Sequence, residues 1–175
     1  MKILKLILKG YTRLQLNHIA EFVYTPTDPI QIIIGTNGCG KSSILEELSP
    51  LPAESKYYFK GGSKEIWIAK GKNTYVIKSS FEKKDTHSFI ENDIELNDGG
   101  TVTVQLELVR KYLGYTPETH RLALGHIKFN ELRPPQRKDL FMKLEHANHE
   151  YAVAYYNRLK QRYNDIVSGL RLERK

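Results

Sequence analysis

The amino-acid sequence predicts a mixed α/β fold, and three features of its pattern support this prediction. A glycine-rich loop at residues 35–43 lies between an apolar segment and the opening of a helix. Short segments rich in β-forming residues, separated by glycine turns, follow between about residues 57 and 98 and indicate an antiparallel meander. The last third of the chain has a helical period and predicts a C-terminal helix that starts a coiled coil.

The N-terminal part of the chain is predicted to contain three strands and one helix. Residues 3–8 and 21–24 form the first two strands, with a turn at residues 10–14 between them. The run Ile30–Ile34 is wholly apolar apart from Gln31 and predicts a buried strand that leads into the glycine-rich loop. A helix opens at Ser43 and ends before Pro50, because proline cannot continue it.

The middle of the chain alternates in hydropathy. The predicted meander has strands at residues 65–69, 74–78 and 86–90, and its turns are marked by Gly61-Gly62, Gly71-Lys72-Asn73 and Asp98-Gly99-Gly100. A helix from about Thr103 to Leu113 follows, closed by Gly114. Another short element starts at residues 117–119.

From residue 135 the pattern becomes helical and basic. The apolar stripe consists of Phe141, Leu144, Tyr151, Tyr155, Leu159, Tyr163, Ile166 and Leu170. We therefore predict a head lobe at residues 1–134 and an outgoing helix at 135–175 that starts a coiled coil. A surface helix packed on its own domain is the alternative. The pattern still runs at Lys175, which predicts a longer protein.

Composition and charge bound the class of protein. A chain of 175 residues is long enough for one domain with a substantial core, and its net charge of +7 suits a polyanionic partner. Its single cysteine, Cys39, excludes an internal disulfide and indicates a reducing cytoplasm. No apolar run approaches the length of a membrane span, so we expect no membrane partner.

The glycine-rich loop fits the phosphate-loop pattern G-x-x-x-x-G-K-[ST] at every fixed position. It reads Gly35-Thr36-Asn37-Gly38-Cys39-Gly40-Lys41-Ser42-Ser43. Such a loop turns its backbone N–H groups inward and makes a concave site for an anion. Lys41 would reach the β- and γ-phosphates, and the Ser42 hydroxyl would complete the coordination of Mg²⁺. The sequence therefore predicts a site for ATP with Mg²⁺.

A complete nucleotide hydrolase of this type needs an acidic residue at the end of an apolar strand. Only the segment 88–91, which ends in Glu91, resembles such a strand end, and it lies in the meander. The sequence also lacks a Ser-Gly-Gly signature that could bind the γ-phosphate across a dimer. It therefore predicts half of an active site, and a chain that does not hydrolyse ATP alone.

The order of these elements resembles a known family. The first strand, the turn with Arg13, the phosphate loop, the meander and the segments 120–125 and 134–138 follow one another as in an ABC-type ATPase head. They resemble the N-terminal head lobe of SMC-like double-strand-break repair ATPases of the SbcC type. The large ATPase subunits of phage recombination nucleases are the most similar, and the resemblance covers nearly the whole chain.

The resemblance implies an ATPase that acts in DNA repair and recombination. In such proteins the C-terminal lobe of the same protein, reached through an antiparallel coiled coil, supplies the acidic strand end and the signature. Two heads close on two ATP molecules, a nuclease subunit docks at the base of the coiled coil, and double-stranded DNA lies across the closed heads. The expected location is the cytoplasm, or the host cytoplasm for a phage protein.

Site residues carry over from the family one at a time. Lys41 and Ser42 match directly, as a catalytic residue and a Mg²⁺ ligand. Arg13 lies near a family arginine that contacts nucleotide. His120 stands where the family has a glutamine that contacts Mg²⁺ and water, so it is a candidate catalytic and metal residue; a surface-loop histidine is the alternative. Arg137 matches a basic residue at the start of the outgoing helix, which implies a contact with the other lobe or with a DNA phosphate, and a plain helix-terminal charge is equally consistent.

Three other functions stay open on the sequence. One is a chromosome-organising SMC-type ATPase without a nuclease partner, and another is a small phosphate-loop kinase, which would need an acidic strand end inside this chain. The third is a nucleotide sensor without catalysis. DNA binding would be directed at phosphates, and its candidate residues are the basic helical arm and Lys56, Lys60, Lys64, Lys70 and Lys72.

Overall fold

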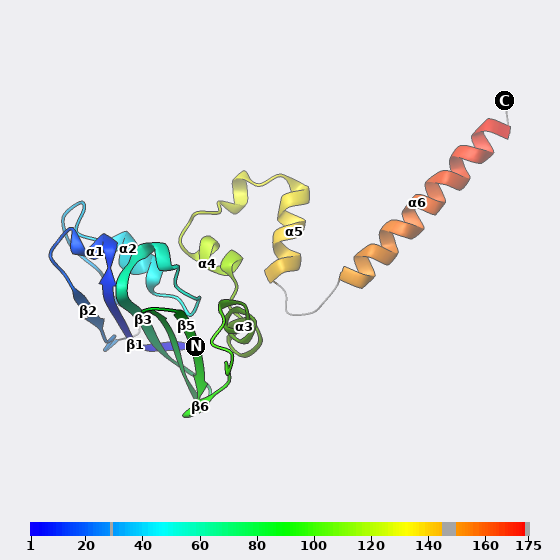
Figure 1. Cartoon of the computed structure of the whole chain (residues 1–175). Helices are drawn as coiled ribbons and strands as arrows, with labels where there is room; N and C mark the ends of the chain where they lie inside the picture. The colour runs from blue at the N-terminus through cyan, green and yellow to red at the C-terminus, as the bar shows by residue number, and fades with distance from the viewer. Residues whose placement is uncertain (29, 145–149, 174–175) are drawn as a thin grey trace. The chain divides into compact units, whose positions relative to one another are not determined.

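A computed structural model describes residues 1–28, 30–144 and 150–173 (Figure 1). The chain divides into two compact units, Met1–Ile127 and Lys128–Lys175. The domain boundary expected between residues 134 and 135 stays a prediction. No helix in the described ranges is long and apolar enough to cross a lipid bilayer.

The first unit contains a six-stranded sheet in the order β2-β1-β3-β4-β5-β6, and all its paired strands are antiparallel. The strands are β1 (Lys2–Tyr11), β2 (Glu21–Tyr24), β3 (Tyr58–Lys70), β4 (Asn73–Phe81), β5 (Asp85–Glu91) and β6 (Ile94–Glu95). The first two predicted strands and the antiparallel meander are therefore confirmed. The predicted meander strands are longer in the structure because the alternation continues through their polar ends.

The helices of the first unit are short. They are α1 (Thr12–Gln15), α2 (Lys41–Glu47), the 3₁₀ turn η1 (Ser55–Tyr57), α3 (Val102–Leu108), the π-helical turn η2 (Val109–Leu113) and α4 (Pro117–Ala123). The predicted helix at 103–113 is confirmed as α3 with η2, and Gly114 closes it with a φ of 69°. The side chains of Thr101 and Thr116 cap α3 and α4 by accepting backbone N–H groups.

The core lies on one face of the sheet. Alternate residues of the central strands are fully buried there, among them Leu6, Ile66, Ile77 and Phe89. Gln105 of α3 is also fully buried, and its amide donates to the carbonyls of Lys78 and Ser88 at 2.9 and 2.7 Å. This side chain joins α3 to two neighbouring strands, because a buried amide must find partners.

The prediction of a turn at Gly61-Gly62 is wrong, because both glycines lie inside β3. The register between β1 and β3 shifts between Lys9 and Tyr11, opposite these glycines. Gly61 has a φ of +85°, and a Cβ on Gly62 would lie 2.8 Å from the carbonyl oxygen of Lys9. The glycines therefore make a bulge in a continuous strand rather than end it.

The prediction of a buried strand at Ile30–Ile34 is also wrong. These residues pair with no strand in the described part of the chain, and Ile30, Ile32 and Ile34 are 83%, 80% and 88% exposed. Only Ile33 packs against the core. Apolar composition predicts burial, but a strand also needs a hydrogen-bonding neighbour. Here β1 already has neighbours on both sides, β2 and β3.

The second unit contains the 3₁₀ turn η3 (Phe129–Glu131) and the helices α5 (Pro134–Leu144) and α6 (Glu150–Glu173). The outgoing helix expected from residue 135 is therefore two helices, on either side of residues 145–149, which lie outside the described residues. Arg137 donates to the carbonyls of Leu132 and Asn130 at 2.8 and 3.0 Å. It thus holds the turn before α5, as the helix-terminal alternative predicts.

A buried ion pair joins α2 to the sheet. The Lys64 Nζ of β3 lies 3.2 Å from the Glu47 carboxylate of α2, and it donates to the Leu51 carbonyl at 3.1 Å. The side chain of Lys64 is only 3% exposed. The prediction that Lys64 contacts DNA is therefore wrong. Burial lowers the pKa of Lys64, and the Glu47 carboxylate opposes this shift.

We predict that Lys64→Ala lowers the free energy of unfolding by about 3–5 kcal/mol, because it leaves the Glu47 carboxylate buried without a partner. The double variant Lys64→Met with Glu47→Leu removes both charges and should be more stable than Lys64→Ala. Urea unfolding followed by circular dichroism measures both. A loss of less than about 1 kcal/mol in Lys64→Ala would contradict a structural role for the pair.

Candidate nucleotide-binding site

The glycine-rich loop keeps two glycines in the left-handed region. Gly38 and Gly40 have φ values of +83° and +96°, which other residues adopt only with strain. A Cβ on Gly40 would also lie 2.6 Å from Leu14 Cδ2, whereas one on Gly38 would meet open space. Leu14 is buried, so it cannot easily move aside. Gly40 is therefore required both by its backbone and by its neighbour.

Lys41 closes the loop on itself. Its Nζ donates to the carbonyls of Gly35 and Thr36, both at 2.7 Å. The Cys39 N–H donates weakly to the same Thr36 carbonyl at 3.4 Å, and the Cys39 Sγ lies 3.8 Å from the Nζ. The ammonium group therefore lies inside the turn of the loop, where a phosphate oxygen could replace either carbonyl as its acceptor.

The start of α2 offers free N–H groups next to this ammonium group. The first helical hydrogen bond runs from Ile44 N–H to the Gly40 carbonyl at 2.9 Å. The amides of Lys41, Ser42 and Ser43 therefore have no helical acceptor. Ser42 is exposed in the same first turn. Together with Lys41, these donors fit the β- and γ-phosphates of a nucleotide.

Mg²⁺ would be held at this loop by the Ser42 hydroxyl and by ligands that arrive with the nucleotide. Within the described ranges, no group of three or more His, Cys, Asp and Glu residues could hold a metal ion. The weak acidic match, Glu91, accepts hydrogen bonds from Asn73 and the Tyr75 hydroxyl at 2.7 and 2.9 Å. Its carboxylate therefore has a structural role at the end of β5.

The turn after β1 supports the loop from one side. Asn17 donates its side-chain amide to the Gly38 carbonyl at 3.2 Å, and Leu14 of α1 packs against Gly40. Sequence reasoning missed both residues, since no fixed position of the phosphate-loop pattern includes them. The only available signal was that the turn at residues 10–14 directly follows the first predicted strand.

Arg13 contacts helix α2, which begins at Lys41 of the phosphate loop. Its guanidinium forms an ion pair with Glu46 of α2 and lies over the ring of Tyr57, 4.5 Å from the ring centroid. The predicted contact of Arg13 with nucleotide stays a prediction. A nucleotide phosphate would compete with the Glu46 carboxylate for this guanidinium.

His120 lies beside the last turn of α2. Its Nδ1 is 3.0 Å from the Tyr115 hydroxyl, and its environment includes the backbone of Glu46. Burial lowers the pKa of His120, and the positive charge of Lys64 lowers it further. The imidazole is therefore neutral at pH 7. Its catalytic and Mg²⁺-binding roles stay predictions, and the structure does not place it against the loop itself.

Comparison with known proteins gives a structural likeness and no sequence match. No family model matches the sequence, and no curated protein matches it. A solved structure described as "Structural biochemistry of ATP-driven dimerization and DNA stimulated activation of SMC ATPases" is similar, with a TM-score of 0.51 and 18% identity. The match covers 83% of this chain and 100% of that chain. It shows a fold that distantly resembles an SMC ATPase head.

We predict that Gly40→Ala weakens Mg-ATP binding at least about tenfold, because the methyl group adds a clash with Leu14 to backbone strain. Calorimetric titration of the chain with Mg-ATP measures the affinity. Gly99→Ala is the matched control, since its Cβ would lie 3.7 Å from the nearest atom, an ordinary contact. Equal affinities for the two variants would exclude this loop as the binding site.

Proposed function

We propose that this chain is the N-terminal lobe of the ATP-binding head of a DNA recombination and repair ATPase. Its heads would dimerise on ATP, bind double-stranded DNA and gate a partner nuclease. The observation that supports this best is the folded phosphate loop, with Lys41 held inside the turn and free N–H groups beside it. ATP and Mg²⁺ are the proposed cofactors.

The exposed run at Ile30–Ile34 supports a missing second lobe. Three isoleucines at least 80% exposed lead directly into Gly35. Burying them in a sheet would require strands that the described residues do not provide. We propose that the C-terminal lobe of the same protein provides these strands, together with the acidic strand end and the signature.

Helix α6 supports a coiled coil that would connect the two lobes. Tyr156, Leu159, Tyr163 and Ile166 are spaced three, four and three residues apart, and each is at least 48% exposed. This is the spacing of a coiled-coil seam. An antiparallel partner helix from the same chain would cover the seam and return the polypeptide to the head.

The proposed mechanism relies on positioning rather than on covalent chemistry. Lys41 would exchange its loop carbonyls for the β- and γ-phosphates, and Ser42 would hold Mg²⁺. Since the acidic strand end would come from the second lobe and the signature from the second head, hydrolysis would require the closed dimer. Binding of ATP would therefore close the heads, and hydrolysis would release them.

A chromosome-organising SMC-type ATPase without a nuclease is the second candidate. The solved structure that this chain resembles concerns SMC ATPases, which suits either function. The two differ in the length and tip of the coiled coil, and a pull-down with the complete protein would identify a nuclease. A small phosphate-loop kinase fits less well, because Glu91, the strand-end acid that the sequence suggested, accepts hydrogen bonds from Asn73 and Tyr75.

Turnover of Mg-ATP by the 175-residue chain tests the half-site proposal. We predict negligible turnover by this chain alone, and turnover of about 0.1–10 per second, within the ordinary enzyme range or just below it, when the C-terminal lobe is added. The same mixture made with Lys41→Ala should be inactive. Robust turnover by the chain alone would contradict the proposal and favour a kinase or a stand-alone hydrolase.

A further inference from the structure

The solvent face of β4 and β5 carries a polar groove. Residues alternate along these strands, so Ile77, Ser79 and Phe81 are buried while Lys78 and Ser80 face outward. In the register of the two strands Lys78 lies opposite Ser88, and Ser80 lies opposite Thr86. These residues line a groove of about 670 Å³ with Lys83 and Lys84 of the hairpin turn. The groove is thus a direct product of the strand alternation.

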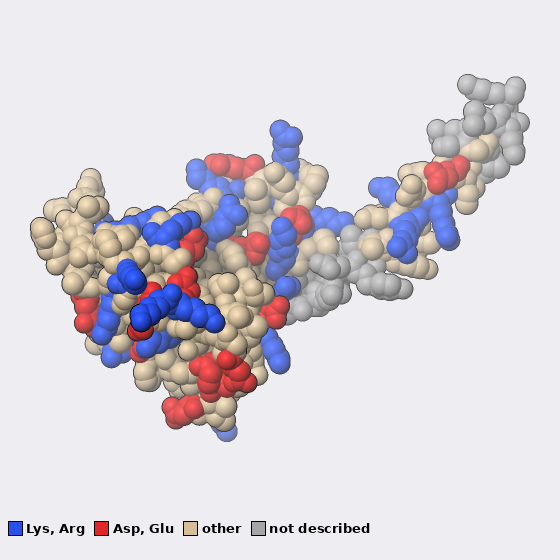
Figure 2. All heavy atoms as spheres, viewed as in Figure 1, with Lys and Arg blue, Asp and Glu red and all other residues tan. Residues whose placement is uncertain are grey.

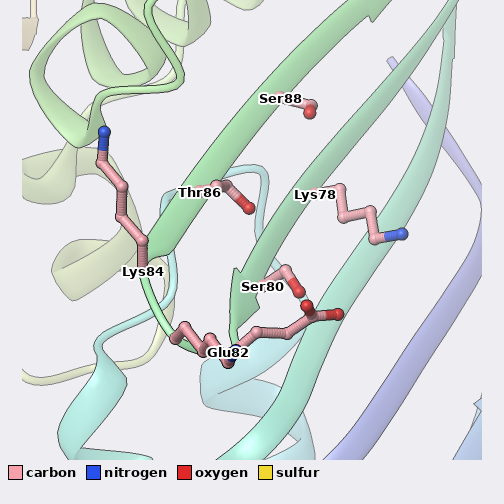
Figure 3. A pocket seen from close by; sticks show the side chains of 7 residues that line it. Lys78, Ser80, Glu82, Lys84, Thr86 and Ser88 are labelled. Carbon is pink, nitrogen blue, oxygen red and sulfur yellow. The ribbon is translucent and has the colours of Figure 1, made fainter.

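The groove combines unpaired cations with free hydroxyl groups. Lys83 and Lys84 are exposed and have no ion-pair partner among the described residues, and Lys78 has only a long contact of 4.0 Å with Glu65. The hydroxyl groups of Ser80, Thr86 and Ser88 make no hydrogen bond within the described ranges. Figure 3 shows the Thr86 hydroxyl between the side chains of Lys78 and Lys84, and the Ser80 hydroxyl beside the Glu82 carboxylate.

These groups suit the phosphates of a nucleic acid. Lysine and hydroxyl side chains are common contacts of phosphate oxygens, and they carry no sequence information. The groove residues include no aromatic side chain on which an unpaired base could stack. The lining therefore favours the backbone of a duplex over a single strand.

Three of the other candidate lysines are less available, whereas Lys60 and Lys72 are exposed but lie outside the groove. Lys64 is buried against Glu47, Lys56 forms an ion pair with Glu54, and Lys70 donates to the Tyr112 carbonyl at 2.6 Å. In the view of Figure 2, acidic side chains gather around β6, at the opposite end of β5 from the hairpin turn that bears Lys83 and Lys84. These acidic side chains therefore lie away from Lys83 and Lys84, whose acidic neighbours in the sequence are Glu82 and Asp85.

We propose that this groove, which consists of Lys78, Ser80, Lys83, Lys84, Thr86 and Ser88, binds the phosphate backbone of duplex DNA. The choice of DNA as the polyanion rests on the proposed function. Glu82 also lines the groove, and its carboxylate reduces the net charge of the lining to +2. A phosphate backbone would approach from the Lys83–Lys84 side. The Glu82 carboxylate would repel the phosphates and so limit the affinity for DNA.

The test measures duplex binding by the full chain without nucleotide. Fluorescence anisotropy with a labelled 20-base-pair duplex, repeated from 50 to 200 mM salt, gives the affinity and its salt slope. The triple variant Lys78→Ala, Lys83→Ala, Lys84→Ala should bind at least about tenfold more weakly at 50 mM salt and lower the slope by about 2–3. Glu82→Gln should strengthen binding about twofold, because it removes one repulsive charge.

A matched triple variant separates the groove from overall charge. Lys2, Lys9 and Lys111 are exposed lysines of the same unit that lie outside the groove and are not among the lysines predicted to contact DNA, and their replacement by alanine changes the net charge equally. We expect this control to keep the affinity within about twofold of the unmodified chain. Equal losses of duplex affinity in both triple variants would overturn the proposal. So would an unmodified chain that binds no duplex, or a groove variant that loses affinity only for single-stranded DNA.

Nucleotide binding distinguishes failure of this inference from failure of the proposed function. The groove variant should bind Mg-ATP like the unmodified chain, because none of its substitutions touches the phosphate loop. If the unmodified chain bound duplex through the groove but bound no ATP, the proposed function would fail and the groove would stand. If it bound ATP but both triple variants bound duplex alike, the groove would fail alone.

Discussion

The phosphate loop depends on how a short helix is attached to the sheet. Helix α2 has seven residues, too few to be stable alone, so tertiary contacts must fix it at both ends. At its start, Leu14 packs against Gly40, and at its end the Glu47 carboxylate meets Lys64 of β3 inside the core. The loop geometry is therefore set by contacts that lie outside the motif.

The sequence pattern predicts those features whose physical causes are local. Strand alternation gives β1, β2 and the meander, and the spacing of Gly35, Gly40 and Lys41 gives the loop. It fails where a distant partner decides the outcome. Ile30–Ile34 is apolar enough for a buried strand, but composition cannot show whether a neighbour exists. In the same way, Gly61-Gly62 has the composition of a turn, and only the register with β1 makes it a bulge.

Charged residues are the least predictable part of the candidate site. A lysine reads the same in sequence whether it faces solvent or the core, yet Lys64 is buried and Lys78, only fourteen residues later, lies in an open groove. The surroundings of His120 were equally unpredictable, since they include Lys64 and the backbone of Glu46, which are both distant in the sequence. Three-dimensional burial, rather than net charge, therefore selects which cations can meet a polyanion.

Strand β3 contacts both proposed sites, the phosphate loop through helix α2 and the polar groove through Lys78. Its neighbouring residues point to opposite faces of the sheet, so Lys64 reaches inward to Glu47 of α2 while Glu65 reaches outward toward Lys78 of the groove. One peptide bond thus separates the contact that holds the loop helix from the contact that borders the groove. Because adjacent strands hold each other in register, a shift of β4 at the groove would act on β3 directly, without the movement of an intervening loop.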